Sequence, residues 1–248
     1  MNIYIVRTSS ILVYMSIKRV KFDVLSLNDV ENYSTIELTR SETSLVNDDV
    51  ENTVHDTRMG PVIFGQKCQT CFGTHETCPG HVGFIRLCKP VFNVLFMNTI
   101  YRILRTICIS CGRVKGRTSE QACTFCFEQH ATIKRESVHA VSSNKLPLSS
   151  AQVYASFRRI RQCDLDVLGI GVRPENMIIY NLIVLPPCAR PAVQQLSGKW
   201  TCDPISYKYA MIIKANNTLK SIEYGNLPTH VIRDAWRTLA MARVDFIG

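Results

Sequence analysis

The sequence predicts an α+β fold in which bound metal holds together a large amount of irregular structure. Three observations predict it. Most cysteines occur in closely spaced pairs, apolar residues recur either at helical spacing or in short β-branched runs, and polar stretches separate these segments. The chain has 248 residues, of which 46% are hydrophobic and 20% charged, so it can bury the core of one large or two small domains.

The cysteine count could indicate a secreted disulfide scaffold, but the spacing favours metal. Eleven cysteines cannot all pair with one another, and disulfide scaffolds are usually much shorter than this chain. Four cysteines have no closely spaced partner, and we expect them to be packed thiols: Cys88, Cys163, Cys188 and Cys202.

The first candidate metal site has the spacing Cys68-x2-Cys71-x6-Cys78-x2-His81. Each pair lets one tight turn aim two ligands at a common point, and two such turns complete a tetrahedron. Three thiolates and one imidazole favour a structural Zn²⁺ with no open position for a catalytic water. His75 is a rival imidazole, but it lies in mid-loop without this turn. The alternative is a set of buried free cysteines.

The second candidate metal site combines two pairs, Cys108-x2-Cys111 and Cys123-x2-Cys126. The spacing resembles a zinc ribbon, although the linker between the pairs is short. The alternative is a redox-active thiol pair, but no thioredoxin-like strand and helix surround these cysteines. With both sites filled by Zn²⁺, the formal charge falls from +9 to about +6.

Positive charge is concentrated in one part of the chain. Lys and Arg total 29 against 20 Asp and Glu, and the isoelectric point is about 9.1. Residues 86–117 contain seven basic residues and no acidic one, which favours a polyanionic partner; the alternative is a solvated helix face. The candidate nucleic-acid contacts are Arg102, Arg105, Arg113, Lys115 and Arg117.

Periodicity and turn residues predict the secondary structure. We expect a strand near 20–25, a helix capped by Ser26 or Asn28, and a loop over 39–57. A long amphipathic helix should run from Val91 to Ile107, and a further helix should begin at Ser149-Ser150. A buried strand from Met177 to Leu185 should end in a stiff extended segment at Pro186-Pro187, and helices should follow near 206–216 and 229–243.

Sequence motifs of catalysis are missing, so no catalytic residue is predicted. The chain has neither a phosphate-binding Gly-x4-Gly-Lys-Ser/Thr loop nor a Gly-x-Ser-x-Gly elbow, and Gly169-Ile170-Gly171 lacks the third glycine of a dinucleotide site. The apolar run at 11–17 is too short for a membrane span and has no signal-peptide cleavage site. We therefore expect a soluble intracellular binding domain with no membrane contact.

Several ordered blocks of the sequence resemble the N-terminal region of the largest subunit of multisubunit DNA-directed RNA polymerases. The blocks are Asp56-Thr57-Arg58-Met59-Gly60, the two pairs of the first metal site with Val82-Gly83-Phe84-Ile85, Lys89-Pro90-Val91-Phe92, Leu168-Gly169, Arg173-Pro174-Glu175-Asn176, Val184-Leu185-Pro186-Pro187, Arg190-Pro191, Tyr207-Lys208 and the run from Ile212 to Asn217. They extend from about residue 20 to about residue 245.

The resemblance implies that the chain forms the clamp, which closes over DNA and the DNA–RNA hybrid. It divides the chain into clamp core at 1–91, a reduced clamp head at 92–180 and a return to the core at 181–248. It implies structural Zn²⁺ at both sites, although the family's remaining two ligands of the second site are commonly farther apart, within a larger clamp head, than Cys123 and Cys126 are here.

The resemblance also implies what this chain lacks. The family's Asp-rich loop, which holds the catalytic Mg²⁺, has no counterpart before Gly248. We therefore expect a split or truncated gene product that is inactive alone and works beside other polymerase subunits, one of which carries the catalytic centre. The expected location is the nucleus or the cytoplasm, including a site of viral transcription.

Two other classes of protein remain open on the sequence alone. One is a free-standing zinc-ribbon transcription factor, which would bind DNA without polymerase subunits. The other is a RING-like ubiquitin ligase, in which the four ligand pairs would alternate between two metals. A clamp instead joins adjacent pairs, so the pairing of the ligands distinguishes the clamp from the RING.

Overall fold

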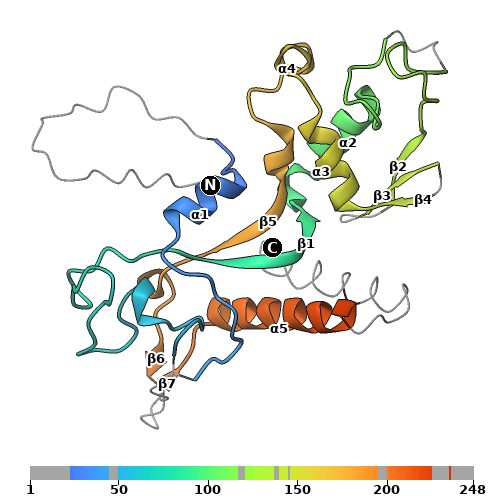
Figure 1. Cartoon of the computed structure of the whole chain (residues 1–248). Helices are drawn as coiled ribbons and strands as arrows, with labels where there is room; N and C mark the ends of the chain where they lie inside the picture. The colour runs from blue at the N-terminus through green and yellow to red at the C-terminus, as the bar shows by residue number, and fades with distance from the viewer. Residues whose placement is uncertain are drawn as a thin grey trace, which may run out of the picture.

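The structure is a computed structural model that describes residues 23–44, 50–116, 121–136, 140–144, 146–194, 200–224 and residue 235. It combines helices with small sheets (Figure 1), which confirms the α+β class. The helices are α1 (Leu27–Tyr33), α2 (Met97–Thr106), α3 (Ser150–Arg158), α4 (Gln162–Leu168) and α5 (Pro204–Tyr224). The strands are β1 (Gly83–Phe92), β2 (Ile133–Arg135), β3 (Val141–Ser143), β4 (Leu146–Leu148), β5 (Ile178–Val184), β6 (Val193–Gln194) and β7 (Trp200–Thr201).

A two-stranded antiparallel ribbon of β1 and β5 lies at the centre of the fold (Figure 1). The pairing runs from Gly83 opposite Val184 to Phe92 opposite Ile178. The predicted buried strand after Met177 is therefore confirmed as β5, and its partner lies far away in the sequence. Smaller sheets have the strand orders β2-β3-β4 and β6-β7.

A bulge in β1, between Arg86 and Val91, is where α5 attaches to the ribbon. Asn216 of α5 is buried, and its Nδ2 donates to the Arg86 carbonyl at 2.9 Å. Its Oδ1 accepts from the Cys88 backbone N–H, also at 2.9 Å. One amide side chain therefore satisfies backbone groups that the bulge leaves without a strand partner.

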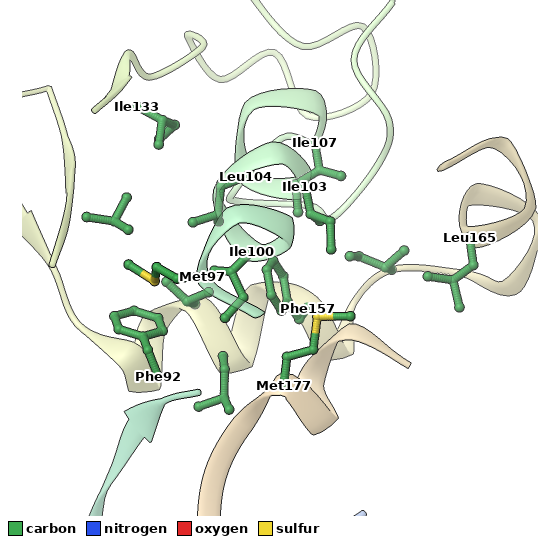
Figure 2. Close-up of a cluster of buried hydrophobic side chains, with 14 residues drawn as sticks. Phe92, Met97, Ile100, Ile103, Leu104, Ile107, Ile133, Phe157, Leu165 and Met177 are labelled. Atoms are coloured by element: carbon green, nitrogen blue, oxygen red, sulfur yellow. The ribbon is translucent and has the colours of Figure 1, made fainter. Parts of the chain in front are cut away.

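Two hydrophobic clusters meet at this ribbon, and both include residues of its strands. One buries residues from segments 36–91 and 182–219. The other, shown in Figure 2, buries residues of segment 92–178 only, including side chains of both α2 and α3. Its largest buried side chains include Phe157, Met97 and Ile100. The ribbon is thus the structural link between the two cores.

Two helices begin at the serines that the sequence indicated. Ser26 caps α1, and a reciprocal capping box joins its side chain and backbone to Asp29. Ser149 caps α3 in the same way with Gln152. Both boxes satisfy backbone N–H groups that the first helical turn leaves unpaired.

The helix predicted from Val91 to Ile107 is wrong over its first six residues. Strand β1 continues to Phe92, a 3-10 turn covers Val94–Phe96, and α2 begins only at Met97. Phe92 pairs with β5, and the Asn93 side chain accepts a hydrogen bond from the Leu95 N–H at 3.3 Å. Strand pairing and this local cap therefore override the helical spacing of the apolar residues.

Other predicted elements differ in extent. Residues 23–26 are irregular rather than a strand, and 20–22 lie outside the described residues. The prolines enter a 3-10 turn at Pro187–Ala189 instead of an extended segment. The helix expected at 206–216 is α5, which begins earlier and ends later, whereas most of 229–243 lies outside the described residues. Helix α4 and the small sheets were not predicted.

None of the described helices is long and apolar enough to cross a membrane.

Arg190 is buried beside the core, with an exposed fraction of 2%. Its guanidinium donates to the carbonyl of Leu185 at 2.8 Å, to Oγ of Ser206 at 2.7 Å and to the carbonyl of Val54. Burial lowers the pKa of Arg190 to about 10, so the group keeps its charge at neutral pH.

His55 lies in the same buried region. Burial, and then the positive charge of Arg190, lower the pKa of His55 to about 4. The folded protein therefore holds this imidazole neutral.

We expect His55 to make the protein less stable in mild acid. The unfolded chain binds a proton below pH 6.5, whereas the folded chain binds it only near pH 4, so the free energy of unfolding falls as the pH drops through this window. The loss should reach about 3 kcal/mol. Denaturant titrations of His55→Leu should show a shallower pH dependence, with the exposed His75→Leu as the matched control. Equal pH profiles for all three proteins would contradict the assignment.

Candidate metal centres

The structure brings together the four predicted ligands of the first site. The ligand atoms of Cys68, Cys71, Cys78 and His81 all lie within 4.8 Å of one another. The Cys71 and Cys78 sulfurs are 3.5 Å apart. Tetrahedral Zn²⁺ with Zn–S bonds of about 2.3 Å separates two sulfur ligands by about 3.8 Å, so the cluster has the right size. His75 instead stacks on Phe64 with a centroid distance of 5.6 Å.

The chemistry of the donors also fits a metal ion. Among the described residues, the buried Nε2 of His81 has no hydrogen-bond partner, which is the state expected of an atom reserved for a metal. The neighbouring His81 side chain and the Gly73 N–H lower the pKa of Cys71 to about 6. One thiol of the site is therefore readily ionised at neutral pH, the form that binds metal.

The second site is assembled from the other two cysteine pairs. Its four sulfurs lie within 4.8 Å of one another, and Cys108–Cys126 and Cys111–Cys123 are each 3.6 Å apart. Burial by itself raises the pKa of Cys123, but backbone N–H groups and neighbouring thiols lower it to about 7. The donors again suit Zn²⁺, and adjacent pairs share a site. This pairing excludes the cross-braced RING, in which the pairs alternate.

Three of the four turns share one backbone geometry. The residue after the second cysteine has a positive φ, and its N–H donates to the carbonyl of the first cysteine at 2.9 Å. These residues are Phe72 (φ 58°), Gly112 (φ 74°) and Phe127 (φ 60°). The turn wraps the backbone around the sulfurs, and glycine is the residue that adopts this conformation most easily.

The Cys78-x2-His81 turn is built differently. Gly80 has φ 80° and donates its N–H to the Cys78 sulfur at 3.4 Å, while the His81 N–H donates to the Met59 carbonyl at 2.8 Å. A side chain on Gly80 would lie 2.5 Å from the Cys188 sulfur. This turn therefore requires glycine for both conformation and space.

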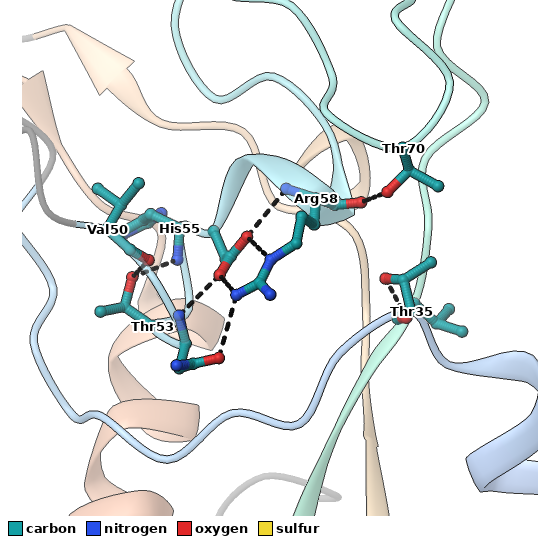
Figure 3. Close-up of polar contacts among 9 residues, drawn as sticks. Thr35, Val50, Thr53, His55, Arg58 and Thr70 are labelled. Atoms are coloured by element: carbon teal, nitrogen blue, oxygen red, sulfur yellow. Dashed lines mark hydrogen bonds and ion pairs between the residues drawn. The ribbon is translucent and has the colours of Figure 1, made fainter.

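A polar network next to the first site anchors its loop (Figure 3). Asp56 accepts hydrogen bonds from the backbone and side chain of Arg58, and the closest N–O distance is 2.6 Å. Burial alone would raise the pKa of Asp56, but these bonds hold it below its usual value. The Arg58 carbonyl accepts from Thr70 Oγ1 at 2.6 Å. The network thus ties the turn at Thr57–Met59 to the loop that carries the first ligands.

Helices α2 and α3 position the second site. Cys108 follows the end of α2, and Ser156 of α3 donates from Oγ to the Ile109 carbonyl at 2.7 Å. Arg159 donates to the Ser110 carbonyl at 2.5 Å. Gly112 lies so close to the Arg159 backbone that an added Cβ would meet it at 2.8 Å. The first half of the second site therefore rests against the C-terminal end of α3.

Most of the predicted nucleic-acid contacts lie next to this second site. Arg102 and Arg105 are exposed on α2, and Lys115 donates from Nζ to the Arg105 carbonyl at 3.0 Å. Burial lowers the pKa of Lys115. The Arg113 guanidinium lies 4.7 Å from the centroid of the Phe125 ring. Arg117 lies outside the described residues.

The unpaired cysteines and the exposed aromatics were not fully anticipated. Cys163 and Cys188 are exposed, so their prediction as packed thiols is wrong; Cys88 and Cys202 are half-buried. Large exposed rings on the metal loops were also not predicted from the sequence: Phe64, Phe72, Phe125 and Phe127. For Phe72, Phe125 and Phe127 the signal is an aromatic residue within or directly after a cysteine pair, a place where solvent exposure is expected; Phe64, which precedes Cys68 by four residues, has no such signal.

Comparison with known proteins places the chain in a family. The family described as RNA polymerase Rpb1, domain 1 matches residues 14–147 and 126–247. The chain therefore belongs to this family, which forms the N-terminal region of the largest RNA polymerase subunit. The predicted resemblance is confirmed.

Curated relatives agree with this assignment. The DNA-directed RNA polymerase subunit Rpo1N of Sulfolobus acidocaldarius is 31% identical over 90% of this chain. The Rpo1N subunit of Methanothermobacter thermautotrophicus is 26% identical over the same share. The DNA-directed RNA polymerase II subunit RPB1 of Euplotoides octocarinatus is 24% identical over 94% of the chain. The chain spans about 30% of the length of the two Rpo1N proteins and 59% of the length of the RPB1 protein.

Metal analysis of the purified protein tests both candidate sites. We expect about two zinc ions per chain and about one in Cys71→Ser, because serine does not supply a thiolate ligand. Cys163→Ser, which changes an exposed cysteine outside both clusters, should keep the wild-type content. Elemental analysis by mass spectrometry checks this. Equal zinc in both variants would contradict the assignment of Cys71 as a ligand.

Proposed function

We propose that this chain is the clamp portion of the largest subunit of a DNA-directed RNA polymerase and contributes to transcription by closing over DNA and the DNA–RNA hybrid. The observation that carries the proposal is the family match across nearly the whole chain, combined with two clusters of four metal-ligand atoms in the order expected. The chain acts inside an intracellular, nucleotidyl-transferring complex.

The proposed division into clamp core at 1–91, clamp head at 92–180 and return to the core at 181–248 is supported by packing. One hydrophobic cluster draws on both outer segments, whereas the other draws on 92–178 alone. Each cluster lies beside one metal site. Motion of the head relative to the core would bend the β1–β5 ribbon, which connects them.

The proposed role of zinc is structural at both sites. Four protein ligands fill a tetrahedral ion, so no position is left for a reacting water. Zn²⁺ holds the loops, while Mg²⁺ for nucleotidyl transfer belongs to another part of the polymerase. The chain by itself is then inactive, and its partners include the polypeptide that carries the catalytic centre.

The proposed nucleic-acid contacts are Arg102, Arg105, Arg113, Lys115 and Arg117. Exposed cations beside a rigid metal loop can approach phosphates without reading the sequence, which suits an enzyme that moves along every template. The exposure of Arg102 and Arg105, opposite the buried face of α2, supports this role.

Affinity purification from the source cells, followed by mass spectrometry, tests the proposed class. We expect other RNA polymerase subunits to be recovered in comparable amounts, because a clamp is a permanent part of the enzyme. Recovery of a solitary chain that shifts DNA in a gel at moderate salt would instead support the free-standing zinc-ribbon transcription factor.

The salt dependence of DNA binding tests the basic surface. Changing Arg102, Arg105 and Arg113 to Gln in the assembled enzyme should reduce the slope of log affinity against log salt by roughly 0.9 for each phosphate that is no longer neutralised. The matched control changes Lys208, Lys214 and Lys220 of α5, which removes the same charge elsewhere. An unchanged slope in the α2 variant, or an equal change in both, would count against the proposed contacts.

A further inference from the structure

We propose that the loop of the second metal site carries a stacking surface for single-stranded nucleic acid, formed by Phe125 and Phe127 together with Arg113. This inference rests on the proposed function and narrows it. It assigns the unpaired strand as the ligand of this loop, with the bases held by aromatic faces and the backbone attracted by neighbouring cations.

Phe127 occupies a backbone position that favours glycine. Its φ is 60°, and its N–H donates to the Cys123 carbonyl at 2.9 Å, as the Gly112 N–H does to Cys108 in the preceding pair. A phenyl ring gains little stability there, because it is 82% exposed. Packing therefore does not explain this ring. Phe72 of the first site has a similar backbone conformation and is 77% exposed, so what distinguishes the second loop is the second ring, Phe125, with Arg113 4.7 Å from its centroid.

Phe125 provides a second aromatic face in the same turn. It is 58% exposed, and the Arg113 guanidinium lies 4.7 Å from its ring centroid. An arginine held over one side of a ring leaves the other side and the guanidinium plane accessible to flat ligands. The cation and the two rings therefore offer the chemistry that stacks on bases regardless of their sequence.

The charge around this loop selects an anion. Arg105 is exposed, and Lys115 reaches its carbonyl at 3.0 Å. Arg159 is exposed as well and donates to Ser110, which lies in the same metal site's first turn. Negative charge near this loop comes from the metal-bound thiolates and from Glu128, the single carboxylate of residues 121–130. The arginines and the lysine around the loop outnumber that carboxylate.

A single strand satisfies both features at once. Its phosphates meet the cations, and its bases are free to stack, whereas the bases of a duplex are already stacked inside the helix. An acidic peptide would match the charge but offers fewer flat faces. The arrangement therefore favours a single strand over a duplex and over an acidic protein segment.

The test uses the full zinc-loaded chain and a fluorescent oligothymidylate, with a duplex of equal length for comparison. Phe127→Gly keeps the backbone conformation, so the loop and its zinc content should survive. Single-strand affinity should fall about tenfold, while duplex affinity and the salt slope stay unchanged, since the cations that meet the phosphates are all retained. The matched control is Phe72→Gly, at the equivalent position of the first site, which should bind single strands as the wild type does.

Three results would overturn the inference. The first is an unchanged single-strand affinity in Phe127→Gly, and the second is an equal reduction of affinity for single strand and duplex. The third is that Phe127→Gly, purified from the source cells, loses a polymerase subunit that co-purifies with the wild type while its nucleic-acid binding stays intact. The last would assign the rings to a protein partner. The proposed function is judged separately, by the subunits recovered and by the salt slope of the α2 variant, so its failure is distinguishable.

Discussion

Twice in this chain, four ligand atoms lie within 4.8 Å of one another, and the irregular parts of the fold depend on these two clusters. Thiolates this close repel one another unless a cation lies among them. Neither hydrophobic cluster includes a buried residue from described positions in 60–84 or 108–132. Only partly buried residues such as Ile109 and Ala131 pack against a cluster from these segments, so apolar burial contributes little to holding the loops, and metal binding, on the order of 10–16 kcal/mol for a structural zinc, is the larger interaction.

The regular elements determine where the two metal loops lie. The ribbon of β1 and β5 starts just after His81 and leads toward α2, whose end leads directly to Cys108. Asn216 fastens α5 to the bulge of this ribbon, and Arg159 fastens the end of α3 to the second loop. Each loop is thus fixed by its metal inside and by hydrogen bonds to a neighbouring element outside.

The ligands and the helix caps could be predicted from the sequence because both are local. Closely spaced cysteine pairs, and a serine three residues before Asp29 or Gln152, can be recognised without knowing which distant segments pack against them. The start of α2 could not be found in this way, because Phe92 joins a strand whose partner, Ile178, is remote in the sequence. The exposure of Cys163 and Cys188 likewise depends on tertiary packing that spacing does not reveal.

Zinc K-edge X-ray absorption of the purified protein tests the central claim most directly, because it counts the atoms around the metal. One site with three sulfurs and a nitrogen and one with four sulfurs should give a spectrum dominated by sulfur at about 2.3 Å with a smaller nitrogen contribution. A shell of light atoms only, or a protein that carries no zinc and has Cys68 and Cys71 oxidised to disulfides, would contradict the account.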